Sequence, residues 1–70
     1  MEEFKLEKND FIELNDLMKR TGMCESGGRA KILITEGRVT VDGRVETRRR
    51  CKIRSGQIVA MEGREVRIVF

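Results

Sequence analysis

The sequence has 70 residues, enough for one domain, because chains divide into several domains only above about 200 residues. It contains no histidine, so it lacks the commonest general base and the commonest transition-metal ligand. Its two cysteines are too few for a four-cysteine zinc site, and no apolar run approaches the roughly 20 residues of a membrane span. With no secretory leader visible, we expect a cytoplasmic protein whose thiols stay reduced.

The net charge is +3, but it is unevenly distributed along the chain. Residues 1–25 carry a net charge of −3, whereas residues 26–70 carry +6. A basic region of this kind favours a polyanionic partner. A mixed surface that charge keeps soluble is the alternative, and composition alone does not decide between the two.

A strand and a helix are the first elements predicted in chain order. Residues 3–7 alternate charged and apolar side chains, which predicts a short half-buried strand. A polar turn is expected at residues 8–10, and from Phe11 the chain leads into a helix that Gly22 is placed to end. The buried positions of this helix follow the spacing i, i+3, i+4: Leu14, Leu17 and Met18.

A second helix and a hairpin follow. The helix is predicted to begin at Ser26, whose hydroxyl can accept a hydrogen bond from an unpaired backbone N–H, and to end at Gly37. Strands at 39–41 and 44–47 are joined by Asp42-Gly43, residues that tolerate the positive φ angles of a type I′ turn. The buried positions of the helix are expected at Ala30, Leu33 and Ile34.

Short strands at 52–54, 57–61 and 65–70 complete the predicted sheet. The sum is an α+β fold in which two short packed helices lie against a small, curved, mostly antiparallel sheet. We expect residues 1–70 to form a single domain.

A basic run after the hairpin is the strongest candidate site. Five cations fall within seven residues: Arg48, Arg49, Arg50, Lys52 and Arg54. They repel one another unless an anion lies close, and phosphate suits arginine because a guanidinium binds it through two hydrogen bonds. A solvated loop is the alternative. The run lies between strands that must pair, however, and this favours a phosphate-binding function.

The start of the second helix is a weaker candidate. A helix N-terminus presents free N–H groups and a partial positive charge, and Gly27 and Gly28 leave these groups open to a phosphate. The same glycines would also ease a tight turn between the helices. The spacing alone slightly favours this structural interpretation.

Four more cations could extend a basic surface: Arg29, Lys31, Arg38 and Arg44. Arg29 and Lys31 leave opposite flanks of the second helix, so Lys31 joins the basic run if helix and hairpin are adjacent. Taken singly, each of the four is better explained as ordinary surface charge.

Cysteine and aromatic residues offer no further chemistry in the sequence. Cys24 and Cys51 are interpreted as small buried hydrophobic residues, because a catalytic thiol wants a nearby histidine and the chain has none. The basic run contains no aromatic residue, and the three phenylalanines are expected in the core: Phe4, Phe11 and Phe70. The residues therefore favour contact with the backbone of structured RNA over stacking of single-stranded bases.

Three blocks of the sequence resemble the alpha-L RNA-binding domain, a module named after ribosomal protein S-four. They are LNDLMK at 14–19, SGGRAK at 26–31 and VDGRVETRRRCK at 41–52. The likeness covers nearly the whole chain and is greatest to the short stand-alone bacterial members called YbcJ-like. Many members of the wider family carry two basic residues after the serine, where this chain has glycines.

The resemblance implies RNA contact through the second helix and the following hairpin. Carried over by position, it nominates Ser26, Arg29, Lys31, Arg48, Arg49 and Lys52. The chemistry of the residues adds Gly27, Gly28 and Arg50 as candidate RNA-binding positions.

We therefore predict a non-catalytic, monomeric RNA-binding protein that contacts the phosphate backbone of structured RNA, of the ribosomal or transfer RNA class. No cofactor, metal, membrane or small-molecule substrate is expected. The main alternative is a protein-interaction module of the same fold, with Ile32 and the termini forming a contact surface and an acidic partner meeting the basic run. An enzyme that uses a carboxylate or Cys51 is the least favoured alternative.

Overall fold

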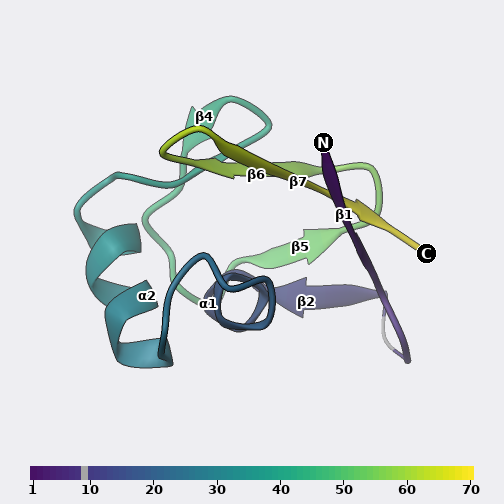
Figure 1. The fold of residues 1–70 in the computed structure, drawn as a ribbon, viewed down its shortest axis with the longest axis horizontal. Helices are drawn as coiled ribbons and strands as arrows, with labels where there is room; N and C mark the ends of the chain where they lie inside the picture. The colour runs from purple at the N-terminus through teal and green to yellow at the C-terminus, as the bar shows by residue number, and fades with distance from the viewer. Residues whose placement is uncertain (9) are drawn as a thin grey trace.

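The computed structural model describes residues 1–8 and 10–70, which form two short helices, a five-stranded sheet and a two-stranded sheet (Figure 1). The helices are α1 (Leu14–Arg20) and α2 (Gly27–Thr35). The larger sheet has the order β1-β7-β6-β3-β4, and its strands in chain order are β1 (Glu2–Lys5), β3 (Thr40–Val41), β4 (Arg44–Val45), β6 (Ile58–Met61) and β7 (Arg64–Val69). The smaller sheet pairs β2 (Phe11–Glu13) with β5 (Lys52–Arg54). β1 and β7 are parallel, and the other pairs in the described chain are antiparallel, so the predicted fold class is confirmed.

α1 buries the predicted stripe, since its three apolar residues have no exposed surface: Leu14, Leu17 and Met18. Its end is also confirmed, because Gly22 adopts a φ of +78° and donates its N–H to the Lys19 carbonyl at 3.2 Å. The strand that precedes this helix was not predicted. Residues 11–13 are extended and pair with β5, which places Ile12 opposite Ile53 in the core.

α2 follows its prediction at both ends. Ser26 has extended backbone, and its hydroxyl oxygen accepts the N–H of Arg29 at 3.2 Å. Gly37, just after the helix, adopts a φ of +76°. The buried face consists of the predicted residues, Ala30, Leu33 and Ile34.

The hairpin turn is confirmed, with φ angles of 52° at Asp42 and 83° at Gly43. The Asp42 carboxylate also accepts the backbone N–H of Ile58 at 2.9 Å, which ties the turn to β6. The return strand is shorter than predicted and ends at Val45. The chain then leaves the sheet toward α1.

The core lies between the helices and the two sheets, and Phe4 packs against it from β1. The prediction that Phe70 belongs to the core is wrong, because this side chain is 71% exposed. It lies beyond the last register pair, Lys5 with Val69, so neither strand continues to cover it. The turn predicted at residues 8–10 includes Asn9, which lies outside the described residues. In residues 1–8 and 10–70, no helix has the length and apolar character needed to cross a membrane.

Candidate functional site

The arginine turn, which we define as residues 48–51, is anchored by its backbone to the start of α1. Leu14 donates its N–H to the carbonyl of Cys51, and Asn15 donates its N–H to the carbonyl of Arg49, each at 2.9 Å. These are the first two residues of α1, and such N–H groups have no partner inside their own helix. The arginine turn therefore caps α1, and α1 in return fixes the position of the turn.

Arg48 is held by the carboxylate of Glu46. Its Nε lies 2.9 Å from Oε2, its Nη2 lies 3.1 Å from Oε1, and its backbone N–H donates to Oε2 at 2.9 Å. These hydrogen bonds from Arg48 lower the pKa of Glu46 to about 2, and the Glu46 side chain is only 16% exposed. Arg48 therefore shapes the turn, and its charge is largely balanced.

The other two arginines of the turn differ from each other. The Arg50 Nε lies 3.4 Å from a carboxylate oxygen of Glu13 in β2. Arg49 is exposed and forms no ion pair with any residue that the structure describes. The repulsion expected within the basic run is thus relieved at two of its arginines, and Arg49 remains available to an external anion.

Gly27 and Gly28 differ from the five other glycines, all of which have positive φ angles. A Cβ atom on Gly27 would meet nothing within 4 Å, and one on Gly28 would meet only the Ser26 hydroxyl oxygen, at 3.9 Å. Neither the backbone conformation nor the described neighbours require glycine at these positions. The structural interpretation, a tight turn between helices, therefore has no support in the geometry.

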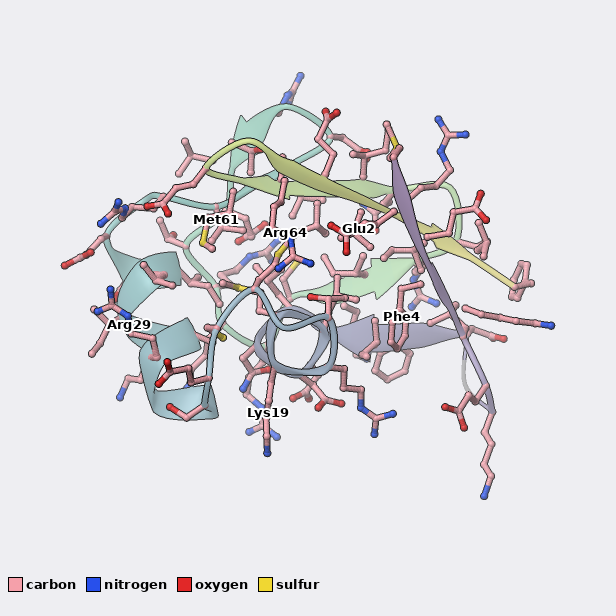
Figure 2. The ribbon with its side chains drawn as sticks, viewed as in Figure 1. Glu2, Phe4, Lys19, Arg29, Met61 and Arg64 are labelled. Carbon is pink, nitrogen blue, oxygen red and sulfur yellow. The ribbon has the colours of Figure 1, made fainter. Side chains whose placement is uncertain are left out.

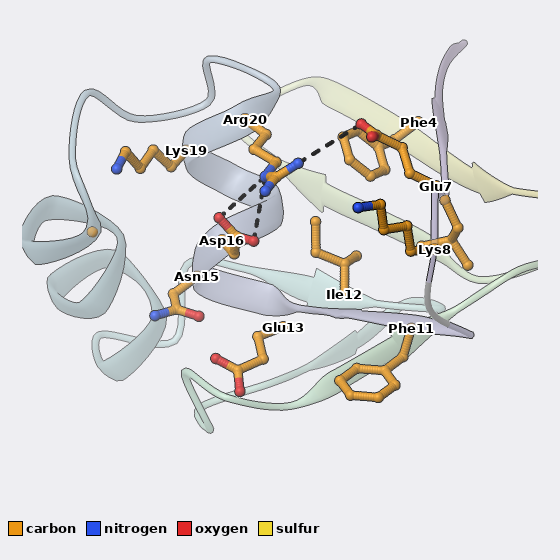
Figure 3. A pocket seen from close by; sticks show the side chains of 12 residues that line it. Phe4, Glu7, Lys8, Phe11, Ile12, Glu13, Asn15, Asp16, Lys19 and Arg20 are labelled. Carbon is orange, nitrogen blue, oxygen red and sulfur yellow. Dashed lines mark hydrogen bonds and ion pairs between the residues drawn. The ribbon is translucent and has the colours of Figure 1, made fainter.

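A surface groove of about 710 Å³ lies beside β1, β2 and α1, and none of the described residues of the arginine turn lines it (Figure 3). It runs along α1 and reaches Gly27 at the start of α2, with Asn15 and Lys19 in its wall. Asn15 therefore adjoins both the groove and the arginine turn, because its backbone N–H holds the turn. The sequence alone gives no sign that Lys19, in the first helix, shares a groove with the start of α2.

Acidic side chains also line this groove. Arg20 pairs with Asp16, one turn earlier on α1, at 3.3 Å, and its Nη1 lies 3.9 Å from Oε1 of Glu7, which follows β1; Figure 3 draws both contacts. The half of the groove near β1 is therefore a mixture of charges. Its half near Gly27 carries Lys19, so only that end suits an anion.

The remaining predicted cations are spread over α2 and the hairpin. Arg29 and Lys31 are both exposed, and Lys31 follows Gly27 by one turn on the same flank of α2. Arg29 lies on the opposite flank, at the outer side of the helix in Figure 2. Arg38 is engaged by Glu36 and Glu62.

The predicted link between Lys31 and the basic run requires that the second helix lie beside the hairpin, and the contact nearest to this helix is made by Gly37, just after its end. A Cβ on Gly37 would lie 3.5 Å from Cγ1 of Val45. Arg44, in the same hairpin, is exposed and makes no ion pair within the described chain. Gly37 therefore lies beside the hairpin, but the structure records no bond between Lys31 and the arginine turn among the described residues, so the joint surface remains a prediction.

The outer face of β2 and β5 carries an aromatic residue among the cations. Phe11 is half-buried and pairs in register with Arg54, and Glu13 pairs with Lys52. Lys52 Nζ lies 4.9 Å from the centre of the Phe11 ring, and Arg54 Cζ lies 5.6 Å from it. The expectation that Phe11 belongs to the core is wrong. Sequence reasoning could not find this cluster, because strand pairing alone brings its members together.

The two thiols are free, as expected, with Cys24 buried and Cys51 half-buried. Burial raises the pKa of both groups, so neither is the thiolate that nucleophilic catalysis requires. Within residues 1–8 and 10–70, no cluster of three or more Cys, Asp or Glu side chains could hold a metal ion.

Known proteins resemble this chain over almost its full length. The family model described as "S4 domain" matches residues 4–69. "Putative RNA-binding protein YbcJ" of Escherichia coli (strain K12) and "Uncharacterized protein YbcJ" of Shigella flexneri are each 54% identical over 69 residues, covering 99% of this chain and 99% of theirs.

A solved structure is similar to this chain in fold as well as in sequence. The solution structure of YbcJ from E. coli is 53% identical and covers 100% of this chain and 89% of that one, with a TM-score of 0.76. It is described as revealing an alfaL motif involved in RNA binding. The chain therefore belongs to the S4 domain family and has the alpha-L fold that its sequence blocks indicated.

Proposed function

We propose that residues 1–70 act as one monomeric, cytoplasmic, non-catalytic domain that binds the phosphate backbone of structured RNA, of the ribosomal or transfer RNA class. Membership of the S4 domain family and the description of YbcJ as an RNA-binding protein support the RNA-binding part of this proposal. The raised pKa values of both thiols support the non-catalytic part.

Arg49 is the observation that carries the proposal. Its guanidinium is exposed and unpaired within the described chain, while its own carbonyl is held by Asn15 at 2.9 Å. The backbone of an anchored turn loses little conformational entropy when its cation binds phosphate. Less of the favourable interaction energy is therefore spent on ordering the turn, and the affinity is higher. Arginine also binds phosphate through two hydrogen bonds.

The start of α2 supplies a second, different contact in this proposal. Its first N–H groups are flanked by Gly27 and Gly28, which place no side chain between a phosphate and the backbone. Lys31 lies on the flank of α2 that carries Gly27, and Lys52 continues the basic surface beyond the arginine turn. Contacts from separate elements favour phosphates held at fixed spacing, which structured RNA provides.

A salt titration tests the proposal. Affinity for a transfer RNA or a ribosomal RNA fragment should fall with salt, with a log–log slope of about −0.7 to −0.9 for each phosphate contacted. Heparin and an unstructured RNA of the same length serve as comparison polyanions. Equal affinity for all three at the same salt concentration would contradict recognition of structured RNA.

One observation favours the alternative of a protein-interaction module. Ile32 is 47% exposed on α2 and Val45 is 61% exposed on β4, beside the end of that helix. Exposed apolar residues of this size suit a protein partner. If RNA is the ligand, the double variant Ile32→Ser, Val45→Ser should bind RNA as the unmodified protein does. Loss of RNA binding in that folded variant would favour an apolar contact over the phosphate contacts proposed here.

A further inference from the structure

The two-stranded sheet has one buried face and one exposed face. Ile12 and Ile53 form its inner face and are 8% and 0% exposed. The opposite face carries Phe11, Glu13, Lys52 and Arg54, because side chains alternate along each strand. Four of these six residues therefore belong to a surface beside the arginine turn.

Phe11 is an unexpected residue on such a face. An antiparallel sheet that is covered on one side normally carries polar side chains on the other. A register shifted by one residue would turn Phe11 inward and Ile12 outward, but the register with β5 places Phe11 outward, opposite Arg54. The side chains of Lys52 and Arg54, both of which are exposed, lie over its ring.

The electrostatics of this face suit an anionic ligand. Glu13 is its single carboxylate among the residues that the structure describes, and Arg50 of the arginine turn lies 3.4 Å from it. Lys52 and Arg54 make no ion pair with any described residue. Two uncompensated cations thus flank an aromatic ring, an arrangement that binds single nucleotides by combined stacking and phosphate contact.

We propose that Phe11 is the stacking site for one unpaired base of the bound RNA, with Lys52 and Arg54 holding the phosphates on either side of it. This inference rests on the proposed function and adds a base contact to its phosphate contacts. On binding, the base replaces one of the two cations over the ring, and that cation moves to the adjacent phosphate. The preferred RNA is therefore a helix with a bulge or loop beside it.

Fluorescence gives a direct test, because the chain contains no tryptophan and no tyrosine. The variant Phe11→Trp introduces a single indole, whose emission a stacked base quenches. The probes are a synthetic hairpin RNA with one bulged adenosine and the same hairpin without the bulge. We expect the bulged hairpin to quench the indole and the fully paired hairpin to leave it unchanged.

Affinities of further variants complete the test. Stacking on one base corresponds to about a fivefold or larger change in affinity. Phe11→Leu should therefore lose roughly fivefold in affinity for the bulged hairpin, and its affinity for the paired hairpin should stay the same. Phe11→Tyr keeps an aromatic ring and should bind both hairpins as the unmodified protein does. Phe70→Leu is the matched control, because this exposed ring has no cation over it in the described chain.

The outcomes separate the inference from the function on which it rests. If the unmodified protein binds both hairpins and Phe11→Leu binds each of them with the same affinity as the unmodified protein, the stacking site is wrong and the phosphate contacts stand. Equal quenching of Phe11→Trp by both hairpins would also overturn the stacking site. If the unmodified protein binds neither hairpin, nor a transfer RNA, the proposed function itself fails.

Discussion

The arginine turn and the start of α2 offer an anion two different kinds of positive charge. The turn presents side-chain cations, and its position is set by backbone hydrogen bonds to Leu14 and Asn15 and by the Glu46 carboxylate. The start of α2 presents backbone N–H groups, and the Ser26 hydroxyl is its recorded cap. One part is held in place by several contacts, and the other by very few.

This difference indicates different roles in binding. In the proposed complex a fixed turn can set the register of the RNA, because the backbone that carries Arg49 is held in place. Glycine at a helix start costs helix stability, about 0.5–1 kcal/mol relative to alanine in a helix interior, and no described contact of Gly27 or Gly28 repays that cost. Glycine at both positions is therefore what the proposed phosphate contact at the start of α2 would favour.

The largest effect is expected for Arg49→Glu. A lost charge-assisted hydrogen bond is worth about 1.5–3 kcal/mol, so RNA affinity should fall by roughly 10- to 100-fold with no change in fold. Fluorescence anisotropy at constant salt measures this. Arg67→Glu on β7 is the control, since it makes the same change of charge at an exposed residue far from the turn in sequence. Equal losses in both variants would show that only net charge matters.

Arg48→Glu is a poor substitute for this experiment. It would bring a second carboxylate to Glu46, which Arg48 now holds at 2.9 Å, and would disturb the turn itself.

Ser26→Ala tests the other side of the comparison. Loss of the hydroxyl that accepts the Arg29 N–H should lower the free energy of unfolding by about 1 kcal/mol, measured by urea denaturation. RNA affinity should fall with it, because the first turn of α2 frays. Ser55→Ala is the control, since no side-chain hydrogen bond of Ser55 is recorded in the described chain. An unfolding free energy equal to that of the control would show that the cap adds nothing.

Glu46→Gln should destabilise the protein by about 0.5–1 kcal/mol near neutral pH, as expected for a well-formed surface ion pair. The pKa of Glu46 in the folded protein is lowered to about 2 from its ordinary 4.5. Its contribution to stability is therefore complete above about pH 4.5 and is lost as the pH falls toward 2.

Urea denaturation between about pH 6 and pH 2 measures this contribution. The unmodified protein should lose more stability over that range than Glu46→Gln does, with Glu65→Gln as the exposed control. Parallel curves for Glu46→Gln and the unmodified protein would mean that the contact with Arg48 does not order the turn.

Gly28 gives the smallest expected effect. Space is available for a side chain, so Gly28→Ala should fold at least as stably as the unmodified protein. Gly28→Glu should bind RNA roughly two- to fivefold more weakly than Gly28→Ala, because its carboxylate competes with phosphate for the helix start. Binding and unfolding are measured for both variants. If the two bind RNA equally, the start of α2 does not contact phosphate.

Much of the fold could be predicted from the sequence because its signals are local. The i, i+3, i+4 spacing of Leu14, Leu17 and Met18 depends only on helix geometry, and all three are buried. Likewise, Asp42-Gly43 determines its own turn through the conformations that these two residues tolerate.

The errors arise where distant pairing decides. Phe11 precedes the helix by only a few residues, but its pairing with β5 makes it a strand residue beside Lys52 and Arg54. Arg50 looks like a free cation until β2 brings Glu13 to it. Composition and spacing contain no information about such partners. The sequence therefore identifies the candidate cations, but it does not show which of them are already paired with a carboxylate in the folded protein.

The hydrogen bonds from Leu14 and Asn15 have a consequence for dynamics. These two amide protons can exchange with solvent only when the arginine turn separates from α1, so their exchange rates report how often it does. RNA that holds Arg49 should slow both rates without touching either residue. Deuterium exchange at these two hydrogen-bonded amides would thus measure how firmly the arginine turn is held against α1.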